Sequence, residues 1–484
     1  MAWVDGFEEN RTSAQLDAVG SAETDLAANR LADRAPFLSS RRLNGRVSWL
    51  WRVIGGIALL GLLAPGVVIS TLSNAFLALF FTMIVLRGAL VAASATYRRK
   101  LTTNRTAFSP MRAWPDYTLL IPLYDEAESV PGLVEALKRL DYPAEKKEVI
   151  FLTEETDSET TQALRRSCLP TNWSILVLPD GFPRTKPRAL NVGLQRACGK
   201  YLTIYDAEDR PHPSQLKAAV SEFEQSGSQE CACVQAPLRA HNAACSWTAG
   251  QWGLEYDVHF GLVVPALADA RLPIALGGTS NHFRVDVLKA VGGWDAWNVT
   301  EDADLGLRFA RLGWKVSSIS PPTLEEAPEK LSVWTAQRSR WIKGYIQTWA
   351  VLMTRPLDVA AEVGVRGYLC THLLLAGAIL SACLHGPLFI WCLASLAIPG
   401  MGVGGISLAV VSLGYLVSAV SAILAPGNRR HRWLLVMTLP IYWPLLSIAA
   451  TRAIVELFRS PYSWAKTPHG LTAHAPSLDP AAFY

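Results

Sequence analysis

The stretch at 292–349 begins GGWDAWNVTEDADLGLRFARLGWKV and ends QRSRWIKGYIQTW. Its first part sets an acidic triplet, Thr300-Glu301-Asp302, directly before a predicted helix at 303–311. A carboxylate is favoured there because the helix dipole and the free amides of the first turn both attract it. Its last part, 337–341, combines two guanidinium groups with an indole. Guanidinium pairs suit a diphosphate and an indole offers a flat apolar face for a sugar ring, so the stretch predicts a site for a phosphorylated sugar.

Composition points to a protein with a membrane part. The chain has 484 residues, of which 50% are hydrophobic, and a mean hydropathy of +0.20. This length exceeds one ordinary domain, so a soluble domain joined to membrane segments is expected. The net charge of +4 gives no reason to expect a nucleic-acid partner. The eight cysteines are scattered without a CxxC pair, which predicts reduced thiols rather than a zinc site.

The N-terminal fifth of the chain predicts a polar leader followed by a membrane hairpin. Residues 1–46 are rich in Ala, Ser and charge, which predicts a mostly disordered cytoplasmic leader with one amphipathic helix and no signal peptide. Two apolar runs, 49–70 and 72–96, can each cross a bilayer core of ~30 Å and make a hairpin over 47–97. Basic residues flank both ends, so both ends are expected to be cytoplasmic. Arg87 in the second run either meets a polar path or extends to the interface.

Three more apolar runs, 368–398, 406–425 and 433–454, predict a second membrane region over 366–456. The first of them contains His385-Gly386-Pro387, so it is either one kinked span or two short ones. We therefore predict three or four membrane spans in this region and five or six in the whole chain. A re-entrant turn at 440–444 remains an alternative to the sixth span. A tail at 457–484 carries a polar and aromatic cluster: Trp464, Lys466, Thr467 and His469.

Between the membrane regions, residues 112–330 alternate apolar runs with helical patterns. Runs at 117–123, 148–152, 174–178, 201–205 and 232–235 predict strands, and stretches at 126–140, 158–167, 188–198 and 213–224 predict helices. Regular strand–helix alternation predicts an α/β domain with a mainly parallel sheet, whose ligands bind at the carboxyl ends of the strands. Alternation alone does not separate this sheet from a generic dinucleotide-binding arrangement.

The pairing of TED at 300–302 with QxxRW at 337–341 resembles the signature of processive family 2 glycosyltransferases, the cellulose, chitin, hyaluronan and poly-N-acetylglucosamine synthases. The resemblance covers about 117–349 and implies a GT-A catalytic domain between transmembrane helices. It implies inverting transfer from a nucleotide-diphosphate sugar, a UDP-sugar rather than a GDP-sugar, to a growing β-linked polysaccharide or a lipid-linked acceptor. It also implies a bacterial inner membrane, a cytoplasmic catalytic domain, and export of the product with periplasmic or outer-membrane partners.

An acidic loop at 205–211 follows an apolar strand and resembles the DxD motif of that family. Asp206 and Glu208 are two apart at a strand end, where they can hold a divalent cation and, through it, a diphosphate. The resemblance implies Mg²⁺ or Mn²⁺. Glu208 stands where the family has Asp, so Asp209 is an alternative ligand.

Other loops match the donor-binding and acceptor-binding segments of the family. PLYDE at 122–126 implies a nucleoside pocket lined by Tyr124 and Glu126, and TEET at 153–156 implies that Glu154, or else Glu155 or Asp157, faces the base. KPRALNVG at 186–193 implies that Lys186 or Arg188 reaches a phosphate or ribose. GGTSNHFR at 277–284 implies acceptor contacts from Thr279 and His282, although a buried structural role for His282 is equally expected.

The resemblance assigns Asp302 as the general base that deprotonates the acceptor hydroxyl, with Glu301 tuning its pKa. It assigns the diphosphate and acceptor contacts to Gln337, Arg338, Arg340 and Trp341. The alternative for 331–357 is an amphipathic helix at the membrane interface, because Trp334, Trp341 and Trp349 alternate with basic residues.

The tail cluster resembles a gating loop that closes over the nucleotide, and its alternative is a simple interfacial anchor. Two other functions remain open: transfer of a single sugar to a lipid carrier, and an inactive membrane scaffold. The altered acidic motifs favour the scaffold and QRSRW argues against single-sugar transfer.

Overall fold

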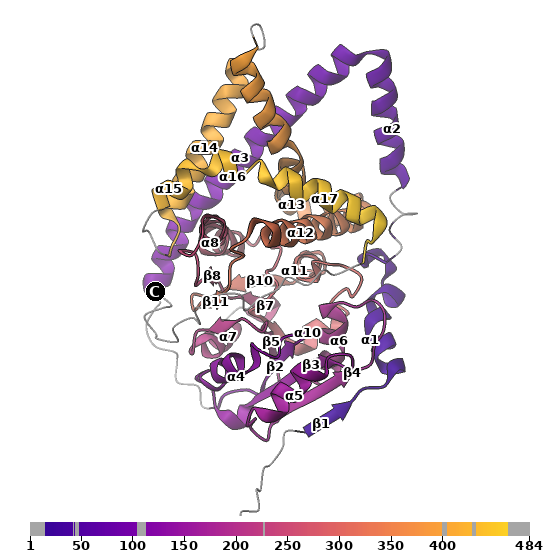
Figure 1. Ribbon diagram of the computed structural model, residues 1–484, viewed down its shortest axis with the longest axis vertical. Helices are drawn as coiled ribbons and strands as arrows, with labels where there is room; N and C mark the ends of the chain where they lie inside the picture. The colour runs from indigo at the N-terminus through magenta and orange to yellow at the C-terminus, as the bar shows by residue number, and fades with distance from the viewer. Residues whose placement is uncertain are drawn as a thin grey trace, which may run out of the picture.

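The computed structural model describes residues 15–41, 43, 48–103, 113–225, 228–398, 404–427 and 432–462. An α/β domain occupies one end of the molecule and long helices project from it (Figure 1). The elements up to the acidic loop are β1 (Gln15–Ala18), α1 (Ser21–Arg34), η1 (Pro36–Leu38), α2 (Ser48–Leu63), α3 (Pro65–Thr103), β2 (Tyr117–Pro122), α4 (Val130–Lys138), η2 (Ala144–Lys146), β3 (Lys147–Glu154), α5 (Ser158–Arg166), β4 (Trp173–Leu178), α6 (Lys186–Arg196) and β5 (Tyr201–Ile204).

The remaining elements complete the domain and the second membrane region. They are β6 (Arg210–Pro211), α7 (Gln215–Phe223), η3 (Ser228–Glu230), β7 (Cys231–Gln235), β8 (Leu238–Ala240), α8 (Trp247–Val258), the π-helix η4 (His259–Val263), α9 (Val264–Asp269), β9 (Asn281–Arg284), α10 (Val285–Ala290), α11 (Glu301–Arg311), β10 (Lys315–Ser318), β11 (Thr323–Glu325), α12 (Leu331–Met353), α13 (Pro356–Ala397), α14 (Gly405–Leu424), α15 (Arg432–Met437), α16 (Leu439–Tyr442) and α17 (Leu445–Arg459).

The main sheet has eight strands in the order β1-β4-β3-β2-β5-β9-β7-β10, and every neighbouring pair is parallel except the two made by β9. A small second sheet has the order β6-β11-β8. The five predicted strands and the five predicted helices of the domain are all present. The predicted α/β domain with a mainly parallel sheet is therefore confirmed, and the loops after β2, β3 and β5 lie at the same edge of it.

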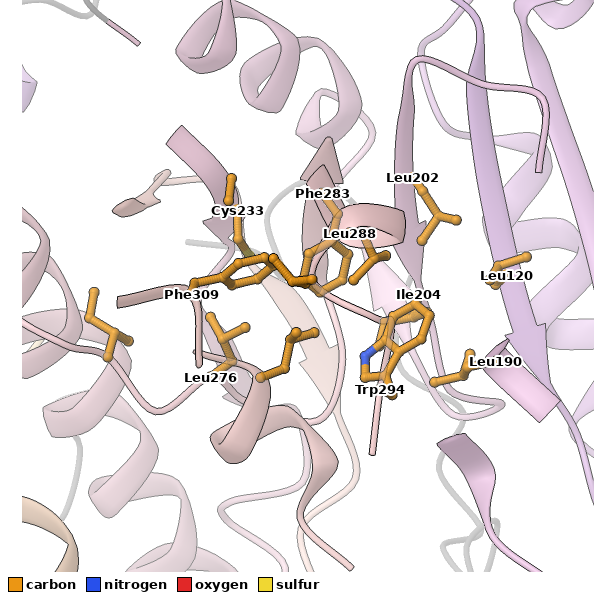
Figure 2. Packing of buried hydrophobic residues seen from close by; sticks show 14 of the residues in the cluster. Leu120, Leu190, Leu202, Ile204, Cys233, Leu276, Phe283, Leu288, Trp294 and Phe309 are labelled. Carbon is orange, nitrogen blue, oxygen red and sulfur yellow. The ribbon is translucent and has the colours of Figure 1, made fainter. Parts of the chain in front are cut away.

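One aromatic cluster ties the antiparallel strand to the helix that follows the TED triplet. Phe283 of β9 packs edge-to-face on Trp294 with ring centroids 5.6 Å apart, and its ring lies 6.1 Å from that of Phe309 on α11. Figure 2 shows these rings together with Leu288 and Leu276 between the sheet and α11. Burial of these side chains fixes where the N-terminus of α11 lies against the sheet.

The prediction of a mostly disordered leader is wrong for residues 15–41. β1 pairs in parallel with β4 at the edge of the main sheet, and α1 is the expected amphipathic helix. The helix buries Thr24, Ala27, Ala28 and Leu31, which lie on one face at helical spacing. The leader is ordered because this face packs on the domain and the edge strand satisfies its backbone hydrogen bonds.

Among the described residues, four helices are long and apolar enough to cross a membrane: Pro65–Ser94, Pro356–Ala397, Gly405–Leu424 and Leu439–Arg459. Helices α2 and α3 form a hairpin at the predicted place (Figure 1), but within the described part of the chain only α3 supplies a candidate membrane span, since α2 is shorter than the predicted run at 49–70. The turn of this hairpin lies at Ala64 and not at the predicted position near 71, because Pro65 starts α3 and shortens α2 to 16 residues.

In the second membrane region the non-helical residue of α13 is Gly364, with φ 70°, whereas Pro387 lies within the helix. The predicted run at 368–398 is therefore one span that continues through Pro387, and Gly364, where glycine tolerates positive φ, lies before that run. The last apolar run is divided at Thr438 and Trp443 into α15, α16 and α17. In Figure 1, α17 lies lengthwise along α12, and the buried Ile342 of α12 packs against its Ala449 and Ala453.

Candidate functional site

A cavity of about 1780 Å³ extends from the carboxyl ends of the strands to the membrane helices. Predicted site residues from seven separate segments line it: Tyr124, Glu126, Glu154, Lys186, Asp206, Glu208, Thr279, Glu301, Asp302, Gln337, Arg338, Arg340 and Trp341. Residues of α3, α13 and α14 line its other end. The fold therefore joins the predicted donor and acceptor residues in one space that continues between the membrane helices.

The TED triplet supplies two carboxyl groups at the start of α11. Asp302 is half-buried, and its Oδ1 accepts a hydrogen bond from the backbone amide of Ala303 at 2.8 Å. Burial raises the pKa of Asp302 to about 6, although that amide and Lys186 lower it. Burial, with the charge of Asp302 second, raises the pKa of Glu301 to about 8. Glu301 has the higher pKa of the two acids and takes up a proton before Asp302, so Asp302 is the better candidate for an ionised base.

Lys186 connects the first acidic loop to the glycine loop. Its Nζ donates to Asp206 Oδ1 at 2.5 Å and to the carbonyl of Gly278 at 2.8 Å. Burial alone would lower the pKa of Lys186, but Asp206 and Glu301 outweigh it and the pKa is raised. Lys186, rather than Arg188, is thus the basic residue of this segment that lines the cavity.

Asp209, the alternative metal ligand, holds the acidic loop through one carboxylate oxygen, while its buried Oδ1 has no hydrogen-bond partner among the described residues. It is fully buried, and its Oδ2 accepts from the Asp206 amide at 2.7 Å and from the hydroxyl of Thr279. Burial, followed by the charges of Asp206 and Glu208, raises its pKa well above the ordinary value. Asp209 therefore shapes the acidic loop, and Thr279 is occupied in holding it.

The carboxylates at this part of the cavity fit a weakly held divalent cation. Asp206 and Glu208 face the cavity, and Glu325 of β11 lines it beside them. Burial, and then Asp209, Glu208 and Asp206, raise the pKa of Glu325 well above normal. No group of three His, Cys, Asp or Glu side chains stands ready to hold a metal ion within the described ranges. Mg²⁺ is commonly held by one or two carboxylates together with substrate phosphates, so such a site forms fully only with the donor.

Tyr124, Glu126 and Glu154, the residues predicted to contact the nucleoside, all line the cavity. Of the candidates at the end of β3, Glu154 lines the cavity. Asp157 instead caps α5 and also accepts a hydrogen bond from the Asp125 amide at 2.5 Å. Arg188 is buried and donates to Glu154 at 3.2 Å and to the carbonyl of Pro179. Its predicted contact with a phosphate or ribose is therefore wrong: Arg188 orients Glu154.

The four predicted contact residues of the QRSRW motif, Gln337, Arg338, Arg340 and Trp341, have different surroundings. Gln337 accepts from Trp252 Nε1 at 2.9 Å, and Arg338 pairs with Glu255 and lies 4.5 Å from the ring centroid of Trp341. The glutamate pairing occupies Arg338, which counts against a direct diphosphate contact. Arg340 lines the cavity opposite the acids: burial lowers its pKa, and Glu301, Asp206 and Asp302 oppose that effect. Arg340 is thus the guanidinium of the motif that faces Asp206 and Asp302.

The tryptophans of α12 pack inside the protein. Trp334 is fully buried and donates to Tyr442 at 2.9 Å, and Trp341 stacks on Tyr256. Trp349 donates to His372 at 3.0 Å. These contacts explain the tryptophan spacing by packing against α8, α13 and α16 and leave the membrane-surface explanation without support.

His282 has the structural role and not the acceptor contact. It is fully buried on β9, and its Nδ1 lies 2.6 Å from the hydroxyl of Tyr117. Burial lowers its pKa to about 3, so the ring stays neutral. The alternation of side chains along β9 turns His282 away from the loop of glycines before it.

The loop before the TED triplet is held from several directions. Asn191 of α6 exchanges two hydrogen bonds with the backbone of Trp294, at 2.8 and 2.9 Å. Asp295 is buried and accepts from Ser39 Oγ at 2.9 Å and from the Ser40 amide at 2.6 Å. Trp297 packs 5.3 Å from Phe182 and 5.0 Å from Tyr462. The ordered leader, the loop that carries Phe182 and the residues directly after α17 therefore meet at the loop before Glu301 and Asp302.

Sequence reasoning missed Glu325, Tyr256 and Tyr345, which also line the cavity. None of the three stands in a recognisable motif, and only the fold brings them to the site. The predicted gating residues, Trp464, Lys466, Thr467 and His469, lie outside the described residues.

Comparison with known proteins agrees with this geometry. Residues 115–344 match the family model described as glycosyltransferase like family 2. The chain is 26% identical over 241 residues to Probable glucomannan 4-beta-mannosyltransferase 15 of Arabidopsis thaliana, covering 48% of this chain and 44% of that one. It is 25% identical over 278 residues to the beta-monoglucosyldiacylglycerol synthase of Synechocystis sp., covering 55% and 56%. The chain spans about half the length of the curated relatives it matches.

Among solved structures, the mannosyltransferase of Pyrobaculum calidifontis in complex with GDP-Man and Mn²⁺ is 17% identical, with a TM-score of 0.46 over 78% of this chain and 99% of that one. The match over residues 115–344 indicates a glycosyltransferase domain similar to family 2, and the mainly parallel sheet agrees with it. Helices long enough to cross a membrane flank this domain on both sides.

Proposed function

We propose that this protein transfers a sugar, with inversion at the anomeric carbon, from a nucleotide-diphosphate sugar to a growing β-linked saccharide at a membrane. The observation that carries the proposal is the single cavity that Tyr124, Glu154 and Asp206 share with Asp302 and Trp341. A cavity that continues from these residues between membrane helices suits an acceptor or product that moves into the bilayer. The proposed location is the bacterial inner membrane with the domain on the cytoplasmic side and with export of the product.

Each residue has a role that its surroundings support. Asp302, ionised at neutral pH, takes the proton of the acceptor hydroxyl as that oxygen attacks the anomeric carbon. Arg340 and Lys186 provide positive charge for the departing diphosphate. Trp341 offers a face for the acceptor sugar. A divalent cation at Asp206 and Glu208, Mg²⁺ or Mn²⁺, would supply further charge stabilisation for the diphosphate when the donor is bound.

Among the described residues, Glu154 is the only group assigned to contact the base. One carboxylate does not discriminate between uracil and guanine, so the donor is either a UDP-sugar or a GDP-sugar. The test is to incubate detergent-purified protein with a panel of both and to measure release of the nucleoside diphosphate. Release from one donor that is lost in Asp302→Asn supports the proposal. Donor binding without release in every combination would instead favour an inactive membrane scaffold.

A further inference from the structure

Helix α3 contributes a charged side chain, Arg87, to the lining of the cavity. Arg87 lies seven residues before Ser94, the end of the apolar segment, so at 1.5 Å per residue it sits about 10 Å inside that end. Its side chain is exposed and lines the cavity. An arginine at this depth is costly unless it meets water or a polar partner, and it therefore marks a polar pathway or a ligand.

His259 lies opposite Arg87 at the start of the π-helix η4, which packs against α3. Burial, and then the charge of Arg87, lower the pKa of His259 to about 4, so the imidazole is neutral. Within the described part of the chain, neither the Arg87 guanidinium nor the His259 ring forms a hydrogen bond to a protein group. Both side chains line the cavity and have donors available for a ligand.

The charges around this pair favour an anion. The nearest acid acting on Arg87 is Glu255, which already accepts from Arg338 and from Tyr442, the latter at 2.9 Å. The guanidinium groups of Arg87 and Arg338 and the carboxylate of Glu255 together leave a net positive charge at this part of the cavity. Asp257 is paired with Arg432 at 2.8 Å and does not offset it. A phosphate group matches this combination of a guanidinium and a neutral imidazole donor.

Beyond Arg87 the cavity wall becomes mostly apolar. The two helical hairpins, α2–α3 and α13–α14, diverge away from the domain (Figure 1). Side chains of α3, α13 and α14 line the cavity between them, among them Phe76, Phe80, Leu374, Leu388, Val411 and Val417. An apolar groove that begins at a cationic group has the polarity of a lipid with an anionic headgroup.

We propose that the acceptor is a lipid-linked saccharide whose phosphate binds Arg87 and His259 and whose hydrocarbon chain lies between α3, α13 and α14. This inference rests on the proposed glycosyl transfer and names its acceptor. A hydroxyl oxygen of the saccharide attacks the anomeric carbon of the donor sugar, and its proton passes to Asp302. The bond from that carbon to the diphosphate breaks, and the nucleoside diphosphate leaves with the electron pair.

The test compares three acceptors with the donor that the purified protein accepts: monosaccharides on polyprenyl diphosphate, the same monosaccharides as neutral alkyl glycosides, and the free sugars. Inorganic phosphate is added as a competitor, to separate a lipid headgroup from a free phosphate. Arg87→Gln should raise the KM for the charged lipid acceptor by about tenfold, the loss of one charge-assisted hydrogen bond, and should leave the KM for the alkyl glycoside unchanged. Arg87→Lys should recover part of the loss.

Arg52→Gln, the same change on α2 outside the cavity, is the matched control and should have no effect. Equal use of charged and neutral lipids, or equal loss of both in Arg87→Gln, would overturn the inference. A failure of donor turnover with every acceptor would count against the proposed transfer instead. In that case native mass spectrometry still tests the lipid site. The inference requires that less phosphorylated lipid stays bound to Arg87→Gln than to the wild-type protein.

Discussion

Lys186 Nζ lies 2.5 Å from Asp206 Oδ1, so the first acidic residue of the predicted metal site is already paired with an ammonium group. The same ammonium donates to the carbonyl of Gly278 in the loop that faces Asp302. A cation that binds Asp206 must share or displace this contact, and Lys186 is then free to approach the diphosphate. The pair therefore links metal binding to donor binding.

The first prediction concerns this link. Lys186→Gln should lower the concentration of Mg²⁺ or Mn²⁺ needed for half-maximal activity, because Asp206 loses its competing partner. The KM for the donor should rise by about tenfold because a charge-assisted hydrogen bond is lost. Both constants come from nucleotide release measured against metal and donor concentration. An unchanged metal requirement would show that Asp206 does not take part in cation binding.

The second prediction concerns the metal itself. Excess chelator should abolish activity and added Mg²⁺ or Mn²⁺ should restore it, because Asp206 and Glu208 need a cation to hold a diphosphate. Glu208→Asp should retain more activity than Glu208→Ala, since it keeps a carboxylate. Full activity in chelator would exclude the site.

The third prediction separates the two acids of the TED triplet. Asp302→Asn should reduce transfer by ~10²–10⁴-fold with donor binding nearly intact, because a proton acceptor is removed. Glu301→Gln is the matched control and should stay within about tenfold of wild type, since a protonated Glu301 already resembles an amide. Rates and donor affinities of both variants provide the check. Equal losses would contradict the assignment of Asp302 as the base.

The fourth prediction concerns pH. Burial raises the pKa of Asp302 to about 6, and the base works only when it is deprotonated. The rate of transfer should therefore rise as the pH increases through about 6 and should level off above it. Measurement of kcat/KM for the donor from pH 5 to 8 would test this, because that constant reports the ionisation of the free enzyme. A rate that falls across this range would be incompatible with an ionised Asp302.

The fifth prediction concerns the contact between the ordered leader and Asp295. Asp295→Ala leaves the Ser40 amide and the Ser39 hydroxyl without their acceptor, which costs about 1–3 kcal/mol. Its thermal midpoint should fall, and residues 15–41 should become sensitive to protease. Asp33→Ala, which removes only a surface ion pair with Arg41, should change neither. Protease resistance equal to wild type in Asp295→Ala would contradict the contact.

Tyr462 packs on Trp297 and lies 3.4 Å from the Ser40 carbonyl, so the chain leaves α17 on the catalytic side of the molecule. If the following segment gates the site, a single cysteine at Lys466, in a background without the native eight, should be labelled only from that side. Donor with metal should protect it. Labelling from the opposite side would end the gating hypothesis.

The sequence predicted the sheet and most of the cavity because strand–helix alternation and motif order determine which loops share an edge. It did not predict which side chains are already occupied by internal partners. Arg188, Arg338, Thr279 and His282 stand in the expected loops, yet each bonds to a protein group that only the fold brings near.

The leader was misjudged for a similar reason. Its Ala-rich composition resembles a disordered segment, and the partners that order it, β4 and Asp295, are distant in sequence. Arg87 shows the opposite case: the sequence left two explanations open, and its place in the cavity wall supports the polar path.

The most direct test of inverting transfer is the anomeric configuration of the product. Detergent-purified protein is incubated with its donor, a divalent cation and an acceptor, and the new linkage is read by NMR from the coupling of its anomeric proton. An α-linked donor should yield a β-linked product that is absent in Asp302→Asn. A product that keeps the α configuration would contradict single displacement with Asp302 as the base.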